Sequence, residues 1–420
     1  MKLTNKKFIL FLLALVVGTL TLIGVFNARE KRTWPFNSGL SQWFSPSLKK
    51  IVYDLTSPSG RVVSSFLYNI YISYYSIPDP EAAGGGGAVN ELIPGVALVA
   101  ENNGQLLIFH EKTGLFDRVE SEAITKLFSS VRDVIRFDKS NVSYLALLGT
   151  TKESNGCKGI ALYLSKYDFS PEKNKLTVDQ PRLLWATEKG CKDPVDNNAG
   201  GRVVYREDIF YVSTGWFMGG GSLDDTPPLA QETDNSFGKI MKVAWNGDSE
   251  LISMGHRNPQ GLFFAKNGSI LFSTEHAIRG GDKLNIIANG ANYGWPCEVY
   301  GTPYGYDFSR PTAEEKYTIK NGKCSEKAFT PPIFYWPDLT GISQGLEYSG
   351  NEFAAFQNNL LVGSLAGTSI YRIRLGDANN VMFIERINVH ERVRDLTLTS
   401  EGKILVLTDG GSLLMLSKHD

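Results

Sequence analysis

One pattern of polar and hydrophobic positions repeats along most of the chain. From about residue 90 onward, a polar or glycine-containing turn leads repeatedly into a short run of Leu, Ile, Val or aromatic residues, as expected of strands. Six segments show the pattern: NGQLLIF at Asn103, NVSYLAL at Asn141, REDIFYV at Arg206, NGSILFS at Asn267, QNNLLVG at Gln357 and EGKILVL at Glu401. Six repeats with insertions of uneven length predict an all-β, six-bladed β-propeller over residues 90–420. A β-sandwich or a solenoid would also repeat its turns, but the uneven insertions favour the propeller.

A different pattern opens the chain. Three lysines precede an unbroken apolar run, Phe8–Phe26, whose length as a helix would nearly match the thickness of a hydrocarbon core. No small-residue cleavage pattern follows, so residues 1–30 are predicted to be an uncleaved signal anchor that attaches the protein to a membrane as one transmembrane helix. The lysines would keep the N-terminus cytoplasmic and place the C-terminal domain in the periplasm or outside the cell. A buried core helix is the alternative, but such a helix rarely begins at residue 8 behind three lysines.

Residues 31–89 are predicted to join the anchor to the propeller. Hydrophobic pairs recur every four residues at Val62–Val63, Phe66–Leu67, Ile70–Tyr71 and Tyr74–Tyr75, which predicts an amphipathic helix. This helix would pack on the globular body or, as a weaker alternative, lie on the membrane surface. The run Gly84–Gly87 then predicts a flexible linker.

Composition narrows the class of protein further. The chain has 420 residues and a formal net charge of -1, so it carries no basic field that would attract nucleic acid. Its four cysteines fall in two couples that are local in sequence, Cys157 with Cys191 and Cys297 with Cys324. An exported chain could form a disulfide from each couple, whereas the spacing argues against zinc. The spacing alone does not establish the pairing.

The segment GHRNPQGL, at residues 255–262, places an imidazole, a guanidinium and two amides between two glycines, more polar groups than a turn requires. It begins a longer stretch, GHRNPQGLFFAKNGSILFSTEHAIRGGDKLNIIANGANYGWP. Together with GGRVVY (200–205), LAQETDNSFGKIMKV (229–243) and RVRDLTLTSEGKILVLTD (392–409), this stretch resembles the soluble quinoprotein aldose sugar dehydrogenases, the glucose/sorbosone dehydrogenase family. The resemblance covers roughly residue 93 to the C-terminus. It implies a six-bladed propeller that binds pyrroloquinoline quinone (PQQ) and Ca²⁺.

The resemblance also implies which residues bind the cofactor. PQQ carries three carboxylates, and guanidinium groups bind carboxylates in bidentate fashion. The implied cofactor residues are Arg257, Asn258, Arg392, Arg394 and Trp336. Arg392 and Arg394 would point to the same face of a strand. Taken singly, an arginine is more often part of a surface ion pair, and a tryptophan is more often a core residue.

His256 and His276 are expected to brace their loops through hydrogen bonds of their rings. The position that matches the catalytic histidine of the family holds Asn198, and an amide cannot act as a general base. Asp196, two residues away, could replace the base. Asp282 matches an acidic position near the active site of the family, although capping of a turn explains it equally well.

Two further positions depart from the family. The calcium-binding turn reads Ala277-Ile278 where the family has Gly-Pro, although main-chain carbonyls of any residue can bind Ca²⁺. A cofactor-contacting lysine of the family is replaced by Ala366. The sequence therefore leaves two functions open. The first is oxidation of an aldose sugar at C1 with hydride transfer to PQQ and then to an undetermined electron acceptor. The second is a catalytically inactive propeller that binds a glycan, an anionic ligand or a protein partner.

Overall fold

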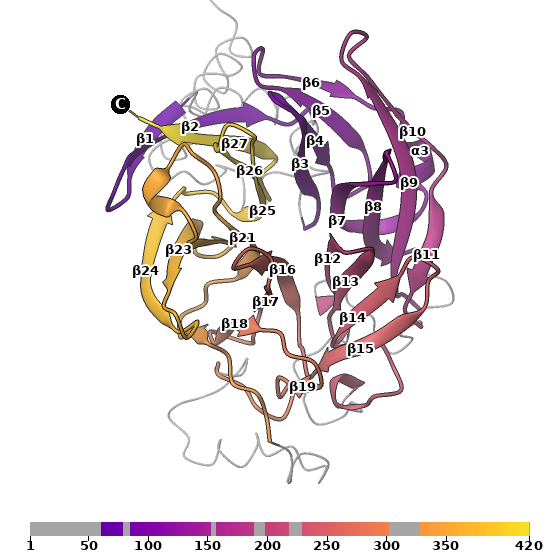
Figure 1. Ribbon diagram of the computed structural model, residues 1–420, viewed down its shortest axis with the longest axis vertical. Coiled ribbons are helices and arrows are strands. Elements are labelled where there is room, and N and C mark those ends of the chain that lie inside the picture. Colours follow the sequence, from indigo (N-terminus) through magenta and orange to yellow (C-terminus); the bar gives the residue numbers. More distant parts are fainter. Residues whose placement is uncertain are drawn as a thin grey trace, which may run out of the picture. The chain divides into compact units, whose positions relative to one another are not determined.

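Six β-sheets are arranged radially about one axis (Figure 1). This computed structural model describes residues 60–78, 85–152, 157–188, 198–217, 229–301 and 328–419. Two compact units divide the chain, Met1–Arg61 and Val62–Asp420, and the second contains the propeller. The predicted signal anchor lies outside the described residues. Within the described ranges, no helix is both long and apolar enough to cross a membrane.

The first three blades use strands in chain order, with the innermost strand first. Blade one contains β3 (Ala88–Ile93), β4 (Val96–Ala100), β5 (Leu106–His110) and β6 (Leu115–Arg118). Blade two contains β7 (Phe128–Lys139), β8 (Val142–Thr151), β9 (Ile160–Ser170), β10 (Lys175–Val178) and β11 (Arg182–Ala186). Blade three contains β12 (Gly200–Arg206), β13 (Ile209–Thr214), β14 (Lys239–Ala244), β15 (Ser249–Met254) and β19 (Ala291–Asn292).

The last three blades complete the ring. Blade four contains β16 (Pro259–Ala265), β17 (Ile270–Glu275), β18 (Asp282–Ile286) and β20 (Phe334–Trp336). Blade five contains β21 (Ile342–Glu347), β22 (Leu360–Ser364), β23 (Ser369–Leu375) and β24 (Val381–Asn388). Blade six contains β25 (Val393–Leu398), β26 (Ile404–Thr408), β27 (Ser412–Lys418), β2 (Asn69–Ser76) and β1 (Gly60–Ser64). Short helical turns lie between strands: α3 (Glu122–Thr125), η3 (Leu229–Gln231) and η5 (Ala354–Phe356).

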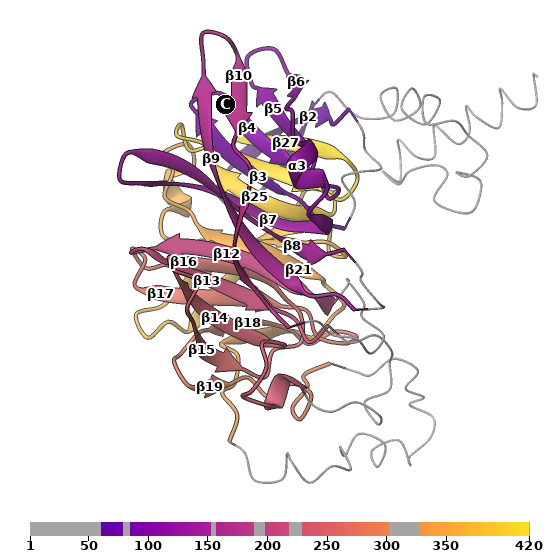
Figure 2. The same ribbon diagram turned by 90° about the vertical axis from the view of Figure 1, so that its right-hand side faces the viewer.

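The innermost strands form a closed ring. Contacts run from β3 to β7, β12, β16, β21 and β25, and β25 contacts β3 again, as the side view in Figure 2 also shows for this last pair. Hydrophobic side chains fill the space between neighbouring sheets. Between blades two and three, for example, Leu148 packs in one cluster with Val203 and Phe210, and all three are fully buried. Burial between sheets therefore stabilises the ring, as the repeats in the sequence predict.

The prediction of an all-β, six-bladed propeller is confirmed. Five of the six repeats that carry the prediction enter the second strand of a blade, while NGQLLIF at Asn103 enters the third strand of blade one, β5. The propeller also begins earlier than residue 90, because β1 and β2 supply the two outer strands of blade six. Strands from the N-terminal and C-terminal parts of the propeller thus share one sheet.

The amphipathic helix predicted from the four-residue spacing is wrong, because this segment forms the hairpin of β1 and β2. Ser65 accepts and donates hydrogen bonds with Tyr68 at the turn, and β2 pairs antiparallel with β27. Ile70 and Ile72 are fully buried while Tyr71 between them is exposed. The true period is therefore two within each strand, and the turn between two short strands produced the apparent period of four.

The part of the predicted flexible linker that the structure describes, Gly85–Gly87, is hydrogen-bonded to β7. The backbone N–H of Gly87 donates to the carbonyl of Val131 at 3.0 Å, and Arg132 Nη1 donates to the carbonyl of Gly85 at 3.0 Å. A Cβ atom on Gly86 would lie 2.2 Å from the Val131 carbonyl oxygen. These glycines permit close approach to β7, while Gly84 lies outside the described residues.

Cys157 and Cys297 are both disulfide-bonded. Cys191 and Cys324 lie outside the described residues, so the predicted couples stay a prediction.

We expect Ile72→Ala to lower the free energy of unfolding by about 2–5 kcal/mol, because the substitution leaves a cavity between β2 and its neighbours. The matched change Tyr71→Ala, on the exposed side of the same strand, should cost about 1 kcal/mol or less. Urea unfolding of the full chain measures both. Equal losses would contradict the alternating burial of a strand.

Candidate functional site

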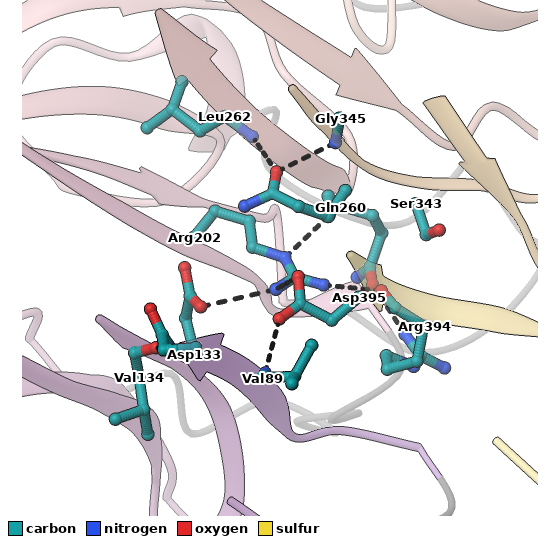
Figure 3. Close-up of polar contacts among 12 residues, drawn as sticks. Val89, Asp133, Val134, Arg202, Gln260, Leu262, Ser343, Gly345, Arg394 and Asp395 are labelled. Carbon is teal, nitrogen blue, oxygen red and sulfur yellow. Dashed lines mark hydrogen bonds and ion pairs between the residues drawn. The ribbon is translucent and has the colours of Figure 1, made fainter. Parts of the chain in front are cut away.

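A buried ion cluster joins the innermost strands near the axis (Figure 3). Arg202 on β12 lies between Asp133 of β7 and Asp395 of β25, with Nη1 at 3.4 Å and 3.1 Å from their Oδ1 atoms. Its Nε donates to the Gln260 carbonyl of β16 and its Nη2 to the Arg394 carbonyl. The second oxygen of Asp395 accepts the N–H of Val89 on β3 at 2.8 Å. One guanidinium thus connects most of the ring.

Burial raises the pKa of Asp133 to about 7, assisted by the Asp395 carboxylate and opposed by the charge of Arg202. Burial raises the pKa of Asp395 too, again against the effect of Arg202. Two carboxylates around a single cation cannot both be ionised without cost, so they titrate as a coupled pair.

Arg394 and Arg392 both contact Asp409, although only Arg394 lies on β25, since this strand begins at Val393. Arg394 is buried and binds Asp409 in bidentate fashion, with Nε at 2.7 Å and Nη2 at 3.0 Å from the two oxygens. Its Nη1 donates to Gln260 Oε1 at 3.0 Å. The Arg392 side chain is 52% exposed and lies 3.2 Å from Asp409. One carboxylate thus orients two guanidinium groups and leaves them a net positive charge.

Arg257 is held by blade four and by a tryptophan. Its backbone N–H donates to Glu275 Oε1 at 2.7 Å, and its Nη1 donates to the His276 carbonyl at 3.3 Å. The guanidinium carbon lies 5.2 Å from the centre of the Trp295 ring, a cation–π contact. Trp295 in turn packs edge-on against Trp216 at 5.3 Å. The Arg257 side chain therefore rests on a rigid aromatic surface.

His256 braces its loop, as predicted. Its Nε2 lies 2.9 Å from Ser253 Oγ and its Nδ1 lies 3.0 Å from Glu275 Oε2. The order serine–histidine–carboxylate matches that of serine hydrolases, but Ser253 and His256 are buried beyond the reach of a substrate. Burial alone would raise the pKa of Glu275, yet Lys283, His256 and the Arg257 N–H outweigh it and hold this pKa at about 2. The permanent charge of Glu275 fixes the backbone at Arg257.

His276 fulfils the bracing prediction only in part. A backbone hydrogen bond with Ile342 holds its ring, but its buried Nε2 has no hydrogen-bond partner among the described residues. Burial lowers the pKa of His276, Asp282 opposes this effect, and Arg394 and Arg257 add to it. The lowered pKa keeps the imidazole neutral at neutral pH, while the Arg257 guanidinium contacts the main-chain carbonyl of the same residue.

Asn198 lies beside the Arg257 loop. The Asn198 carbonyl accepts the N–H of Phe217 at 3.2 Å, and two residues further on the N–H of Gly200 donates to Asn258 Oδ1 at 3.0 Å. The backbone N–H of Trp216 donates to the Arg257 carbonyl at 2.8 Å. The structure therefore brings Asn198, Arg257 and Asn258 together, while Asp196 lies outside the described residues.

Asp282 anchors loops through both of its oxygens. Oδ1 accepts the N–H of Ala277 at 2.9 Å, and Oδ2 accepts the N–H groups of Gly341 and Ile342 at 2.5 Å and 3.2 Å. These contacts account for Asp282 as a structural cap, and its catalytic role stays a prediction. Trp336 pairs with Asp282 across β18 and β20. The Trp336 indole is buried, and its Nε1 has no hydrogen-bond partner within the described ranges.

The turn predicted to bind calcium is lined by apolar groups. Ile278 packs with Ala230 and the indoles of Trp216 and Trp295, and both Ala277 and Ile278 are buried. No group of three or more His, Cys, Asp or Glu side chains in the described part of the chain is placed to hold a metal ion. A calcium ion at Ala277 and Ile278 would therefore depend on main-chain carbonyls.

Several important residues were not singled out from the sequence. Arg202 and Asp395 lie inside the motifs GGRVVY and RVRDLTL, Trp295 lies near the end of the stretch that begins with GHRNPQGL, and Asp409 ends the last motif. Asp133 lies in none of these motifs. Arg202 and Asp395 are 193 positions apart. A single sequence does not indicate such pairs, since only the closed ring of blades brings them together.

The fold and these contacts define a six-bladed propeller with a buried, arginine-rich site near its axis. The family model described as Glucose / Sorbosone dehydrogenase matches residues 88–415, most of the chain. The chain therefore belongs to the glucose/sorbosone dehydrogenase family, as the motifs indicated.

Individual relatives agree with this assignment. Aldose sugar dehydrogenase YliI of Escherichia coli is 28% identical over 243 residues, 53% of this chain and 61% of that protein. Quinoprotein glucose dehydrogenase B of Acinetobacter calcoaceticus is 31% identical over 343 residues, 65% of this chain and 71% of that protein. The PQQ-bound aldose sugar dehydrogenase of Streptomyces coelicolor superposes with a TM-score of 0.58 at 19% identity, over 83% of this chain and 98% of that chain. This last likeness shows a shared fold.

We expect Arg202→Met to lower the free energy of unfolding by about 3–5 kcal/mol, because it leaves two buried carboxylates without their cation. Arg206→Met, at the partly exposed end of the same strand, is the control and should cost about 1 kcal/mol or less. Urea unfolding at pH 7 measures both. A loss for Arg202→Met no larger than that of the control would contradict a central role of the cluster.

The raised pKa of Asp133 predicts a pH dependence. The folded state retains a proton on Asp133 up to a pH of about 7, whereas the unfolded chain releases it near 3.8. The folded state therefore binds more protons between these values, and the free energy of unfolding falls as pH rises through this window. Asp133→Asn removes this titrating group. The free energy of unfolding of the wild type minus that of the variant should therefore decline from pH 4 to 7 and then level off.

The matched variant Asp138→Asn removes an exposed carboxylate from the same strand. Its unfolding free energy should follow the wild-type curve over the same pH range. Parallel curves for Asp133→Asn and the wild type would contradict the raised pKa.

Proposed function

We propose that this chain is a quinoprotein oxidoreductase that oxidises an aldose sugar at C1, with hydride transfer to PQQ. Membership of the glucose/sorbosone dehydrogenase family supports the proposal, as do the sugar dehydrogenase names of its relatives. Oxidation of an aldose at C1 removes a hydride and a hydroxyl proton and leaves a lactone. PQQ, when bound, would supply the group that accepts the hydride.

One observation carries the proposal: the buried Gln260 amide bonds both Arg394 and Asn258, the chain neighbour of Arg257, and so joins the two arginines at one buried site. The two arginines come from blades four and six, so the closed ring places two guanidinium groups around one spot. Such a site fits a planar ligand with several carboxylates, because guanidinium groups form charge-assisted hydrogen bonds to carboxylates. The buried nitrogens His276 Nε2 and Trp336 Nε1, which lack partners among the described residues, would add polar contacts to such a ligand.

PQQ would be held by Arg257, Arg394, Asn258 and the more exposed Arg392. Apolar groups line the turn at residues 277–278, and the described side chains offer no cage of acidic ligands for a calcium ion. A calcium ion held by main-chain carbonyls stays part of the expectation from the family.

The sugar hydroxyl proton needs an acceptor on this chain. Asn198 cannot accept it at neutral pH, and both oxygens of Asp282 already accept backbone N–H groups. We therefore expect weak sugar oxidation by the wild type. Introducing an imidazole at residue 198 should supply the missing base, because Asn198 lies beside the Arg257–Asn258 loop.

The test combines cofactor binding with turnover. We expect purified full-length protein to bind PQQ in calorimetric titration, and Arg257→Met or Arg394→Met to raise the Kd about 10- to 100-fold through loss of charge-assisted bonds. Asn198→His should raise kcat for aldose-dependent reduction of an acceptor dye about 100-fold without a comparable change in Kd. Arg206→Met, away from the site, is the control.

Each outcome separates the alternatives. Absence of PQQ binding to the wild type would overturn the proposed function. Binding of PQQ with no turnover of any sugar, in the wild type and in Asn198→His, would instead favour a propeller that binds the quinone without oxidising sugars.

A further inference from the structure

Gln260 is the second residue of β16 and belongs to the GHRNPQGL segment. Its side chain is buried, and each end of its amide contacts a different residue of the proposed cofactor site. Oε1 accepts a hydrogen bond from Arg394 Nη1 at 3.0 Å, and Nε2 donates to Asn258 Oδ1 at 2.8 Å. Its main-chain carbonyl accepts Arg202 Nε at 2.8 Å, as Figure 3 shows beside the ion cluster.

We propose that Gln260 is a positioning residue that fixes the Arg394 guanidinium relative to the Asn258 amide, so that both engage one anionic ligand together. The inference rests on the proposed function, because it takes that ligand to be the quinone. Gln260 itself acts through its two neighbours.

The direction of these hydrogen bonds follows from the groups at their two ends. The N–H of Gly200 can only donate, so the atom of Asn258 that faces it must be oxygen. The Gln260 atom that faces the same oxygen must therefore be the NH₂ group. The remaining Gln260 oxygen faces Arg394, which can also only donate. Every bond in the chain is thus satisfied in one arrangement of the two amides.

Only an amide of this length satisfies both contacts. A glutamate would keep the acceptor for Arg394 but would have no donor for Asn258 when ionised. A methionine would keep the approximate shape and lose both hydrogen bonds. Among the described residues, Asp409 and Gln260 together engage three of the five N–H groups of Arg394, which fixes the plane of the guanidinium.

A second buried glutamine provides a matched control. Gln344 on β21 is also buried, and its Oε1 accepts the backbone N–H groups of Leu262 at 2.9 Å and Gly345 at 3.1 Å. Replacing Gln344 leaves backbone donors unsatisfied in the same ring of strands without removing a contact to Arg394 or Asn258. General loosening of the ring should therefore appear in both variants, and loss of positioning only in the Gln260 variant.

The experiment measures PQQ binding to full-length variants by isothermal titration calorimetry. We expect Gln260→Met to raise the Kd about 10- to 100-fold, the range typical when a residue that orients a binding side chain is lost. Gln344→Met should change the Kd by no more than about twofold relative to the wild type, while it lowers the Tm about as much as Gln260→Met does. In an Arg394→Met background, Gln260→Met should raise the Kd by a clearly smaller factor than in the wild type, since part of its effect on binding passes through Arg394.

An unchanged Kd for Gln260→Met would overturn the inference, and so would an equal rise for Gln344→Met or full additivity with Arg394→Met. If Gln260→Met does not fold, Gln260→Glu provides the same test, because its lost donor and added negative charge should also weaken quinone binding. A wild type that binds no PQQ would instead overturn the proposed function, which separates the two failures.

Discussion

The ion cluster around Arg202 is the contact on which the centre of the propeller depends. A single guanidinium balances two buried carboxylates, on β7 and β25, and contacts the main chain of β25 and of one further strand, β16. Since Asp395 also binds the N–H of Val89, the cluster involves innermost strands of five of the six blades. Buried charge is costly unless its partners are held in place, so the cluster ties its own stability to closure of the ring.

The site residues are held by extensions of this frame. Arg394 precedes Asp395 on β25, and Gln260 lies on the strand whose carbonyl Arg202 contacts, so both side chains start from fixed backbone. Arg257 has a separate support in Glu275, whose charge is kept by Lys283 and by buried hydrogen bonds. Glu275 thus supports the Arg257 guanidinium, and the fixed backbone of β25 supports the Arg394 guanidinium. A site of this kind is preorganised, because little entropy is lost when an anion binds.

The departures from the family fall on residues that this frame does not require. Asn198 is only partly buried at the edge of the site, and Ile278 packs its side chain among the neighbouring indoles. A change of Asn198 can alter proton transfer at little cost to folding, whereas truncating the buried Ile278 would leave a cavity among the indoles. Loss of Arg202 or Asp409, in contrast, would leave buried partners unsatisfied. The charge frame and the chemistry of the site can therefore vary independently.

The sequence by itself determined the class of fold, the number of blades and the loop that carries Arg257 and Asn258. These features depend on local patterns, since turns, short apolar strands and residues two apart on a strand are set by neighbouring positions. The local pattern of the hairpin of β1 and β2 wrongly predicts a helix, because the burial of β2 depends on β27, more than three hundred residues away. Only the tertiary structure decided that Asp133, Arg202 and Asp395 meet and that Gln260 joins Arg394 to Asn258. The physical reason is that closing the ring, and not any local preference, brings these charges close enough to interact.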